Sequence, residues 1–230
     1  MTFGGLIKSD LVNYPGKIAS AVFTCGCNFR CPYCHNPEFV IKGSDETYFG
    51  ESYTEEDILA FLKKRSGFLE GFVISGGEPT LHDGLAPFIR RVKELGLAVK
   101  LDTNGSRPAV LGALLEEGLL DYVAMDIKAP IAKYPLVGFT DTESILRSVS
   151  LLESSSVEHE FRTTCPRILL QDDDFKAMLP LVGEKSKWYL QTFNPGKTLD
   201  PAYNMVSSFS REELSAIAAS LGRENILVRS

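Results

Sequence analysis

The chain has 230 residues, of which 24 are Lys or Arg and 30 are Asp or Glu, so its formal net charge is −6. This length suits one globular domain, and a hydrophobic content of 44% is enough for a buried core, which excludes a disordered chain. The negative net charge argues against a protein that binds the phosphates of nucleic acids.

The sequence also shows no signal for a membrane or for secretion. The longest apolar stretches, such as residues 109–115, are far shorter than the roughly 18 residues that a transmembrane helix needs. The first ten residues lack a charged start followed by an apolar run. We therefore expect a cytoplasmic protein that binds neither nucleic acid nor membranes.

Expected strands and helices alternate along the chain after residue 17. Segment 17–24 is rich in small and β-branched residues, which favours a buried strand. Further strands are expected at 72–75, 97–101, 121–127, 157–164, 187–193 and 226–229. Helices are expected at 54–65, 83–95, 108–117, 142–153, 172–181 and 210–221, and a loop at 37–53.

The helix that begins after Thr54 has the clearest end signals. Thr54 can cap its first turn, and residues 55–57 place three carboxylates at the positive end of the helix dipole. Residues 63–65 are basic and precede Gly67, as is typical of a helix C-terminus.

Alternating strands and helices predict right-handed crossovers and a parallel sheet. A complete eight-unit barrel needs about 250 residues, so the chain fits an α/β fold with an incomplete (β/α)6 TIM-like barrel better. A doubly wound open sheet is the alternative, and both folds bind ligands at the carboxyl ends of strands. We expect one domain over 1–230, with a lead at 1–17, a partial barrel core at 18–193 and a C-terminal extension at 194–230.

Four of the five cysteines lie within ten residues. Cys27, Cys31 and Cys34 follow the first expected strand with three and two residues between them, and Cys25 is close by. A tight cluster in a cytosolic chain favours a metal over disulfides, and Cys165, which stands alone, is expected to be a buried thiol. Three thiolates can bind three irons of a [4Fe–4S] cluster and leave the fourth iron open. A structural zinc site is the alternative, although zinc ligands usually come as two separated pairs.

At this point the chain resembles a known family. Residues 24–37, Thr-Cys-Gly-Cys-Asn-Phe-Arg-Cys-Pro-Tyr-Cys-His-Asn-Pro, look like the radical S-adenosylmethionine (radical SAM) enzymes, and more narrowly like the activating enzymes of glycyl-radical proteins. Gly-Gly-Leu-Ile-Lys at 4–8 and Tyr-Pro-Gly-Lys at 14–17 resemble the activases of anaerobic ribonucleoside-triphosphate reductase. The resemblance continues through Ser-Gly-Gly-Glu-Pro-Thr at 75–80, Asp-Thr-Asn-Gly at 102–105 and Met-Asp-Ile-Lys at 125–128.

The resemblance implies a cofactor pair and a reaction. Cys27, Cys31 and Cys34 would hold a [4Fe–4S] cluster as catalytic metal ligands, and S-adenosylmethionine would bind its open iron. Reductive cleavage would give a 5′-deoxyadenosyl radical that takes a hydrogen atom from a glycine of a partner enzyme. The implied partners are a glycyl-radical enzyme, first of all anaerobic ribonucleotide reductase, and a flavodoxin- or ferredoxin-type electron donor.

Other functions stay open at this point. The chain could be a pyruvate formate-lyase-type activase. It could be a radical SAM enzyme that acts on a small metabolite, such as a 7-carboxy-7-deazaguanine synthase. A zinc or iron–sulfur binding module without enzymatic activity is the third hypothesis.

The resemblance also assigns residues to S-adenosylmethionine. It places Tyr33 beside the adenine, although a half-buried loop aromatic would look the same. Gly76, Gly77 and Glu78 end a strand, where glycines let the backbone approach a ligand and a carboxylate can receive an ammonium group. An ordinary Gly-Gly turn is the alternative.

Acidic and basic residues at the next strand ends complete the expected site. In related activases the positions that match Asp102, Thr103 and Asp126 help to hold a monovalent cation near the substrate carboxylate, and an ordinary turn is the alternative for Asp-Thr-Asn-Gly at 102–105. Two anionic groups beside a carboxylate need such a cation or lysines, and Lys128 is the expected counter-charge. Arg162 is a further candidate for the methionyl end, with a salt-bridged barrel residue as the alternative.

Three features depart from the family pattern. Cys25 is an extra thiol, and its spacing favours no role in the cluster. Asn194 stands where pyruvate formate-lyase activases have a histidine that reaches the ribose, which weakens assignment to that subgroup. Residues 36–54 contain no cysteine, so the ferredoxin-like insert of some activases is not expected.

Overall fold

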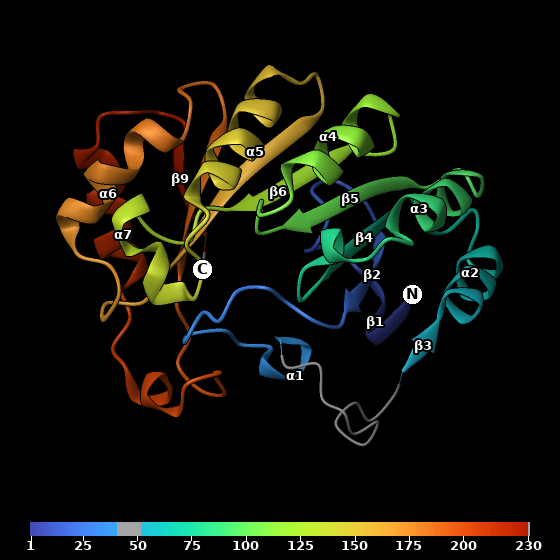
Figure 1. Cartoon of the computed structure of the whole chain (residues 1–230), viewed down its shortest axis with the longest axis horizontal. Helices are drawn as coiled ribbons and strands as arrows, with labels where there is room; N and C mark the ends of the chain where they lie inside the picture. Colours follow the sequence, from blue (N-terminus) through green and yellow to red (C-terminus); the bar gives the residue numbers. More distant parts are fainter. Residues whose placement is uncertain (41–51, 230) are drawn as a thin grey trace. The chain divides into compact units, whose positions relative to one another are not determined.

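The computed structural model describes residues 1–40 and 52–229 (Figure 1). These residues form two compact units, which we call the first and the second unit. The first unit comprises Met1–Asn28, Glu38–Thr103 and Arg107–Val123. The second unit comprises Phe29–Pro37, Asn104–Ser106 and Ala124–Ser230.

The first unit is built on strands β1 (Thr2–Asp10), β2 (Ala19–Thr24), β3 (Tyr53–Thr54), β4 (Gly71–Gly76) and β5 (Ala98–Thr103). Strands β2, β4 and β5 run parallel, as the pattern predicts. Strand β1, which the pattern did not predict, pairs antiparallel with β2 and with β3, so the sheet is mixed at this edge. Residues 1–17, expected as a lead, begin with this strand, which sequence reasoning missed because its half-exposed residues show no strict alternation.

The segment between β1 and β2 gives the Tyr-Pro-Gly-Lys run a structural reason. Tyr14 is buried, and a Cβ atom on Gly71 would lie 2.8 Å from its ring. The Lys17 amide donates to the Tyr14 carbonyl at 3.2 Å, and Gly16 has a φ of +73°. The run is therefore a tight turn whose tyrosine packs against the start of β4.

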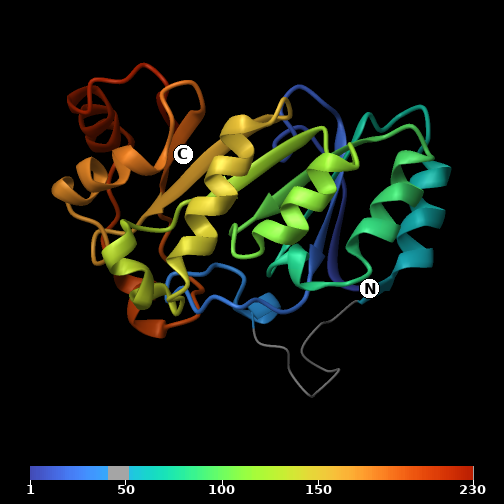
Figure 2. The same cartoon turned by 45° about the horizontal axis from the view of Figure 1, so that its top comes forward.

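Helices α2 (Glu55–Lys64), α3 (Leu85–Lys93) and α4 (Pro108–Glu116) lie on one side of the strands of the first unit (Figure 2). The predicted cap of α2 is confirmed, because the Thr54 side chain accepts from the Asp57 amide and Asp57 bonds back to the Thr54 amide. A short 3-10 helix that the pattern did not predict, η2 (Pro79–Leu81), follows β4.

The second unit contains most of β6 (Tyr122–Asp126), and β7 (Glu158–Cys165), β8 (Lys187–Thr192) and β9 (Ile226–Arg229). Strands β7, β8 and β9 are parallel neighbours, which confirms the expected strand at 226–229. Its helices are α5 (Thr142–Ser154), α6 (Asp172–Met178) and α7 (Arg211–Ser220). It also contains the 3-10 helices η3 (Ile131–Val137), η4 (Leu179–Leu181) and η5 (Pro201–Met205).

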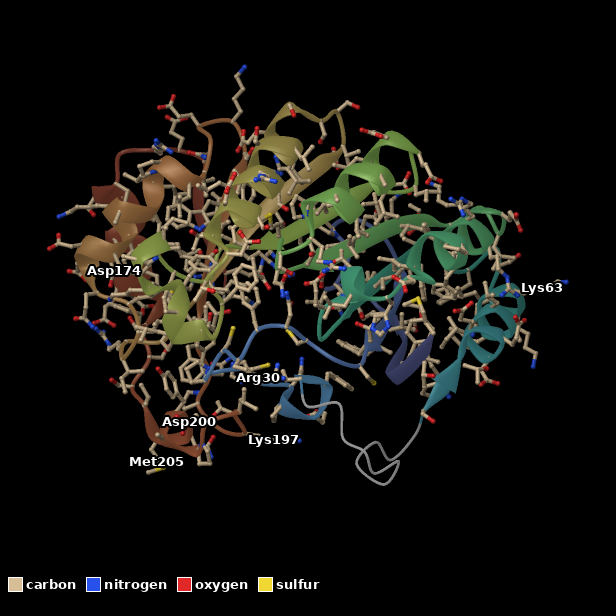
Figure 3. The ribbon with its side chains drawn as sticks, viewed as in Figure 1. Arg30, Lys63, Asp174, Lys197, Asp200 and Met205 are labelled. Carbon is tan, nitrogen blue, oxygen red and sulfur yellow. The ribbon has the colours of Figure 1, made fainter. Side chains whose placement is uncertain are left out.

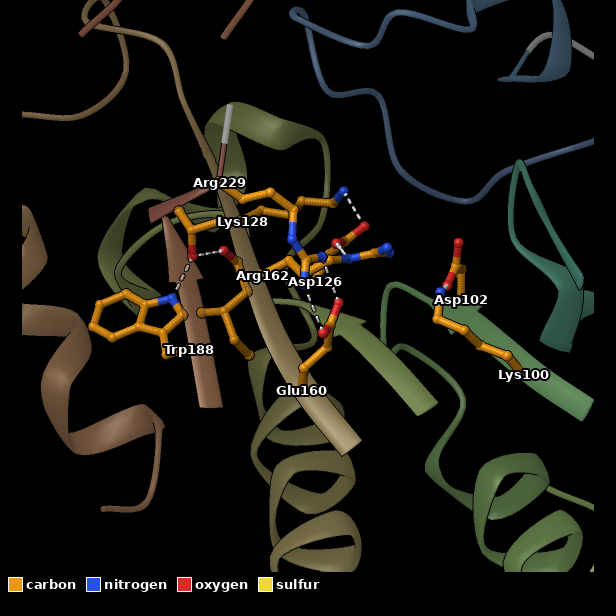
Figure 4. Close-up of polar contacts among 10 residues, drawn as sticks. Lys100, Asp102, Asp126, Lys128, Glu160, Arg162, Trp188 and Arg229 are labelled. Carbon is orange, nitrogen blue, oxygen red and sulfur yellow. Dashed lines mark hydrogen bonds and ion pairs between the residues drawn. The ribbon is translucent and has the colours of Figure 1, made fainter. Parts of the chain in front are cut away.

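Aromatic residues and an ion pair with a buried carboxylate hold the strands of the second unit. Trp188 is fully buried and its indole NH donates to the Thr163 hydroxyl at 2.9 Å (Figure 4). Glu160 on β7 is 1% exposed and accepts two hydrogen bonds from Arg229 on β9, at 2.9 and 3.0 Å. The Arg229 guanidinium lies 3.7 Å from the ring centroid of Tyr189 on β8. As predicted, Cys165 is a buried thiol.

The expected loop at 37–53 is wrong at both of its ends. Residues Pro37–Val40 form the short helix α1, with proline at its first position. Tyr53 belongs to β3. The part of this expected loop at 41–51 lies outside the described residues.

The fold class is α/β, as expected. The six predicted core strands correspond to β2, β4, β5, β6, β7 and β8. In the order in which the described strands hydrogen-bond, β3 and β9 stand at the two ends. Among the helices of the described chain, none has both the length and the apolar character needed to cross a membrane.

Candidate active site

The turn after β4 explains why two glycines are needed there. Gly76 has a φ of +114°, and a Cβ atom on it would lie 2.3 Å from the Thr24 amide nitrogen. A Cβ atom on Gly77 would lie 2.1 Å from the carbonyl oxygen of Gly26. The Glu78 amide donates to that same oxygen at 2.8 Å. The Gly-Gly-Glu turn therefore holds the residue directly before Cys27, and no side chain fits between the two segments.

Glu78 is fully buried and its carboxylate is part of a hydrogen-bond cluster. Its Oε1 accepts from the Thr80 amide at 3.1 Å, from the Thr80 hydroxyl at 2.5 Å and from the Thr103 hydroxyl at 2.8 Å. The structure thus brings together two of the predicted site residues, Glu78 and Thr103. These bonds fix the carboxylate at the end of β4 and also cap η2.

Asp102, at the end of β5, has a counter-charge from its own strand. The Lys100 ammonium lies 2.5 Å from Asp102 Oδ1 (Figure 4). Residues two apart on a strand share a face, so this pair follows from the position of the lysine. Sequence reasoning missed Lys100, although this spacing could have indicated it.

In the second unit, two other segments anchor the cysteine loop at residues 29–37. The Arg30 amide donates to the Val137 carbonyl at 2.8 Å. The carbonyls of Pro32 and Cys34 accept from the amides of Asp200 and Leu199, at 2.9 and 3.1 Å. Asp200 caps the 3-10 helix η5, and Figure 3 shows it on the segment that also carries Met205. Backbone bonds therefore fix the loop that carries Cys31 and Cys34.

The predicted residues Asp126, Lys128 and Arg162 form one charged cluster (Figure 4). Lys128 Nζ lies 2.9 Å from Asp126 Oδ2, and Arg162 Nε lies 3.0 Å from Oδ1. Burial raises the pKa of the Asp126 carboxyl, but the positive charges of Arg162 and Lys128 outweigh it and lower this pKa to about 2. The site therefore holds a carboxylate between two cations at neutral pH.

The thiols of the loop act on the same cluster. Burial lowers the pKa of the Lys128 ammonium, while the charges of Asp126, Cys31 and Cys34 raise it by more, so Lys128 keeps its proton. The Lys128 ammonium therefore lies near the thiols of Cys31 and Cys34, which the motif assigns to the cluster.

Two buried tyrosines also face this part of the second unit. Tyr33 is 3% exposed, and its hydroxyl has no hydrogen-bond partner within the described residues. Burial and the Cys31 charge raise the pKa of Tyr33. Tyr134 on η3 is fully buried, and its hydroxyl accepts from the Lys128 amide at 3.4 Å. Sequence reasoning missed Tyr134, since nothing around position 134 distinguishes it from a core aromatic.

Asn194 differs from the other predicted residues of the second unit because it is exposed. Its predicted contact with a ribose stays a prediction. The assignments of the other site residues to parts of S-adenosylmethionine stay predictions too. So does the single domain at 1–230.

The donor set fits an iron–sulfur cluster in its chemistry. None of the five cysteines forms a disulfide, Cys31 is buried, and Cys27 and Cys34 are partly exposed. Across residues 1–40 and 52–229, no three His, Cys, Asp or Glu side chains form a preassembled metal site. The assignment of the cluster to Cys27, Cys31 and Cys34 therefore rests on their spacing and on the affinity of thiolates for iron.

Comparison with known proteins gives the family. Residues 21–179 match the model of the Radical SAM superfamily. The chain is 30% identical to "Putative glycyl-radical enzyme activating enzyme MJ1227" of Methanocaldococcus jannaschii, over 98% of this chain and 95% of that protein. It is 38% identical to a pyruvate formate-lyase-activating enzyme of Streptococcus mutans, over 54% of this chain and 51% of that enzyme.

A solved structure gives the same fold. The crystal structure of Streptococcus suis SuiB bound to S-adenosylmethionine superposes with a TM-score of 0.67 at 12% identity, over 90% of this chain and 48% of that one. The chain thus spans about half of the SuiB chain, and the likeness shows the fold alone.

These findings confirm the predicted cofactors and the predicted family. A [4Fe–4S] cluster and S-adenosylmethionine are the cofactors of radical SAM enzymes, and this chain is an enzyme of that kind. The match over more than half of the chain, together with a relative that is similar along nearly its whole length, places the chain in the radical SAM superfamily and, within it, in the family of glycyl-radical enzyme activating enzymes.

Proposed function

We propose that this protein generates a glycyl radical on a partner enzyme, and that the partner is anaerobic ribonucleoside-triphosphate reductase. The observation that carries the first part is the similarity to a glycyl-radical activating enzyme relative along nearly the whole chain. That relative contains no large additional domain which this chain lacks, since the match covers 95% of its length.

The chain's own residues support this chemistry in distinct ways. A cluster on Cys27, Cys31 and Cys34 would supply the electron that cleaves S-adenosylmethionine reductively. The Gly76–Glu78 turn positions the loop before Cys27, and the fixed Glu78 carboxylate is an acceptor for an ammonium group. Lys128 and Arg162 together carry one positive charge more than Asp126 neutralises, so they can receive a carboxylate.

The sequence around Cys34, the last cysteine of the cluster motif, supports the reductase as the partner. Cys-His-Asn-Pro at 34–37 resembles the reductase activases, and the cysteine-free stretch at 36–54 argues against activases with a ferredoxin-like insert. The Tyr-Pro-Gly-Lys turn carries less weight, because the packing of Tyr14 on Gly71 explains it without a partner.

We also propose where the enzyme works and what reduces it. The three clustered thiols of Cys27, Cys31 and Cys34 must stay reduced to bind iron, which favours the cytoplasm. A flavodoxin- or ferredoxin-type protein would deliver the electron, since one-electron chemistry needs a one-electron donor.

The test is the appearance of a glycyl radical under anaerobic conditions. The cluster-reconstituted protein is mixed with S-adenosylmethionine, a reductant and an anaerobic ribonucleotide reductase, and electron paramagnetic resonance is recorded. We expect a glycyl-radical signal in the reductase, and none when Cys31→Ala replaces the activase. A reductase that stays silent while 5′-deoxyadenosine accumulates would reject this partner.

A pyruvate formate-lyase-type activase is the second candidate, favoured by the 38% identity to the Streptococcus mutans enzyme over half of the chain. Asn194 argues against it, because that subgroup carries a histidine at this position. A parallel reaction with pyruvate formate-lyase separates the two, since we expect a radical signal in the reductase and none in the lyase.

A further inference from the structure

Lys100 is an unusual residue because its charge is buried. Its side chain is 3% exposed, and that of its partner Asp102 is 12% exposed. Burying an unpaired ammonium group is strongly unfavourable, so a lysine in this position needs an anionic partner. Asp102 Oδ1, at 2.5 Å from Lys100 Nζ, provides one.

The other surroundings of the ammonium also suit a positive charge. Lys100 Nζ lies 5.9 Å from the ring centroid of Tyr122, within the range of a cation–π contact. The Asp10 carboxyl is also within reach of this charge. Burial raises the pKa of Asp10, its hydrogen bonds to Asn13 and Val12 lower it, and Lys100 lowers it further.

The geometry does not fit the monovalent cation that the family resemblance predicts at Asp102. One oxygen of Asp102 is already in contact with a full positive charge. A second cation on the same carboxylate would lie close to the Lys100 ammonium, and two neighbouring positive charges repel each other. Asp126, the other aspartate predicted to bind this cation, has Lys128 and Arg162 as partners within its own unit.

We propose that Lys100 is a built-in counter-ion of Asp102, and that this enzyme binds S-adenosylmethionine without a dissociable monovalent cation. The inference rests on the family's use of S-adenosylmethionine, and not on the identity of the protein partner. Lys100 is a positioning residue, because it acts on the substrate through Asp102.

The first experiment needs no variant. The reconstituted holoenzyme is titrated with KCl at constant ionic strength, with choline chloride as the replacement salt, and the dissociation constant for S-adenosylmethionine and the melting temperature are measured. We expect the dissociation constant to change less than 2-fold and the melting temperature to stay constant. A saturable K⁺ effect of 10-fold or more on binding, or a saturable rise in the melting temperature, would overturn the proposal.

The second experiment removes the charge. In Lys100→Met we expect S-adenosylmethionine to bind about 10-fold more weakly in choline chloride, and added K⁺ to recover at least 5-fold of this loss by taking the place of the ammonium. A variant that binds as tightly as the wild type, or that folds but does not respond to K⁺, would contradict the proposal. A purely structural lysine would not give such a recovery.

Matched variants complete the test. Lys93 also pairs with an aspartate of the first unit, Asp121, at 2.6 Å, but this pair is exposed. Lys93→Met should therefore bind S-adenosylmethionine as tightly as the wild type, in KCl and in choline chloride. If Lys100→Met does not fold, Lys100→Arg is tested in its place, because it keeps the charge. Its binding of S-adenosylmethionine should not depend on K⁺, and a K⁺ requirement in that variant would contradict the proposal. Binding without radical formation on the reductase would reject only the proposed partner.

Discussion

The carboxylates Asp102 and Asp126 lie one residue before the end and at the end of their strands, yet their partners in the two units differ. Asp102 in the first unit has Lys100 beside it, and this pair is almost fully buried. Asp126 in the second unit lies between a lysine and an arginine, and the three side chains are between 15 and 26% exposed to solvent. Among the ion-paired side chains alone, Lys100 and Asp102 balance each other, whereas Lys128 and Arg162 carry one positive charge more than Asp126 neutralises. The difference indicates that the first unit fixes its carboxylate in place, while the second can receive an anion.

The largest expected effect concerns the cysteines that the motif assigns to the cluster. We expect Cys27→Ala and Cys31→Ala each to lose the cluster and to lower 5′-deoxyadenosine formation by more than about 1,000-fold, because an iron would lose its protein ligand. Iron and sulfide analysis with a product assay measures this. Cys25→Ala is the control and should keep the cluster; its loss in that variant would revise the ligand set.

The next effect concerns the packing of the first unit. Gly77→Ala should destabilise the protein by about 3 kcal/mol, because its Cβ would lie 2.1 Å from the Gly26 carbonyl oxygen. Gly84→Ala is a matched control, since its Cβ would meet the flexible Met1 side chain at 3.2 Å and should cost less than about 1 kcal/mol. Urea unfolding gives both values, and equal losses would show that the Gly77 turn can relax.

The charged cluster of the second unit should make stability depend on pH. The pKa of Asp126 is lowered from 3.8 to about 2, so its ionised form adds stability above pH 4 that is lost as the pH falls towards 2. The contribution is ~2 kcal/mol. Urea unfolding at pH 7, 5, 4 and 3 should show Asp126→Asn losing less stability on acidification than the wild type. If the free energy of unfolding falls equally with pH in the two proteins, the two cations do not stabilise the ionised carboxylate of Asp126.

The smallest effect sharpens the comparison within the second unit. Tyr134→Phe removes a hydroxyl that accepts a long hydrogen bond of 3.4 Å from the Lys128 amide. We expect this loss to cost less than about 1 kcal/mol of binding free energy, and S-adenosylmethionine therefore to bind less than about 5-fold more weakly. Equilibrium binding measures it, and a loss above 10-fold would make Tyr134 a principal determinant of the site.

Periodicity and end signals were enough to predict the parallel part of the fold. The cap at Thr54 and the strands that end at Gly76 and Thr103 were predictable because each depends on local sequence. Strand β1 was not, since an antiparallel edge strand takes its stability from pairing with β2 rather than from its own pattern. The helix α1 at Pro37–Val40 was missed because four residues are too few to show a period.

The same division applies to the candidate site. Motif resemblance picked out Asp126, Lys128 and Arg162, and the structure brings these three together. It did not pick out Lys100, because a lysine on a strand is usually solvated; its spacing from Asp102 was a signal, and its burial in the structure makes the pair clear. It attributed the second glycine of the Gly-Gly-Glu run to a close approach to a ligand, whereas the structure shows that the carbonyl of Gly26 leaves no room for a side chain there.

Trp188 has a practical consequence of its own. It is the only tryptophan of the chain, and it is fully buried in the second unit with its indole NH bonded to Thr163. Fluorescence excited at the red edge of protein absorption therefore reports on the second unit alone, while circular dichroism reports on the helices of both units. Recording the two signals on one denatured sample separates the loosening of one unit from that of the other, without any introduced label.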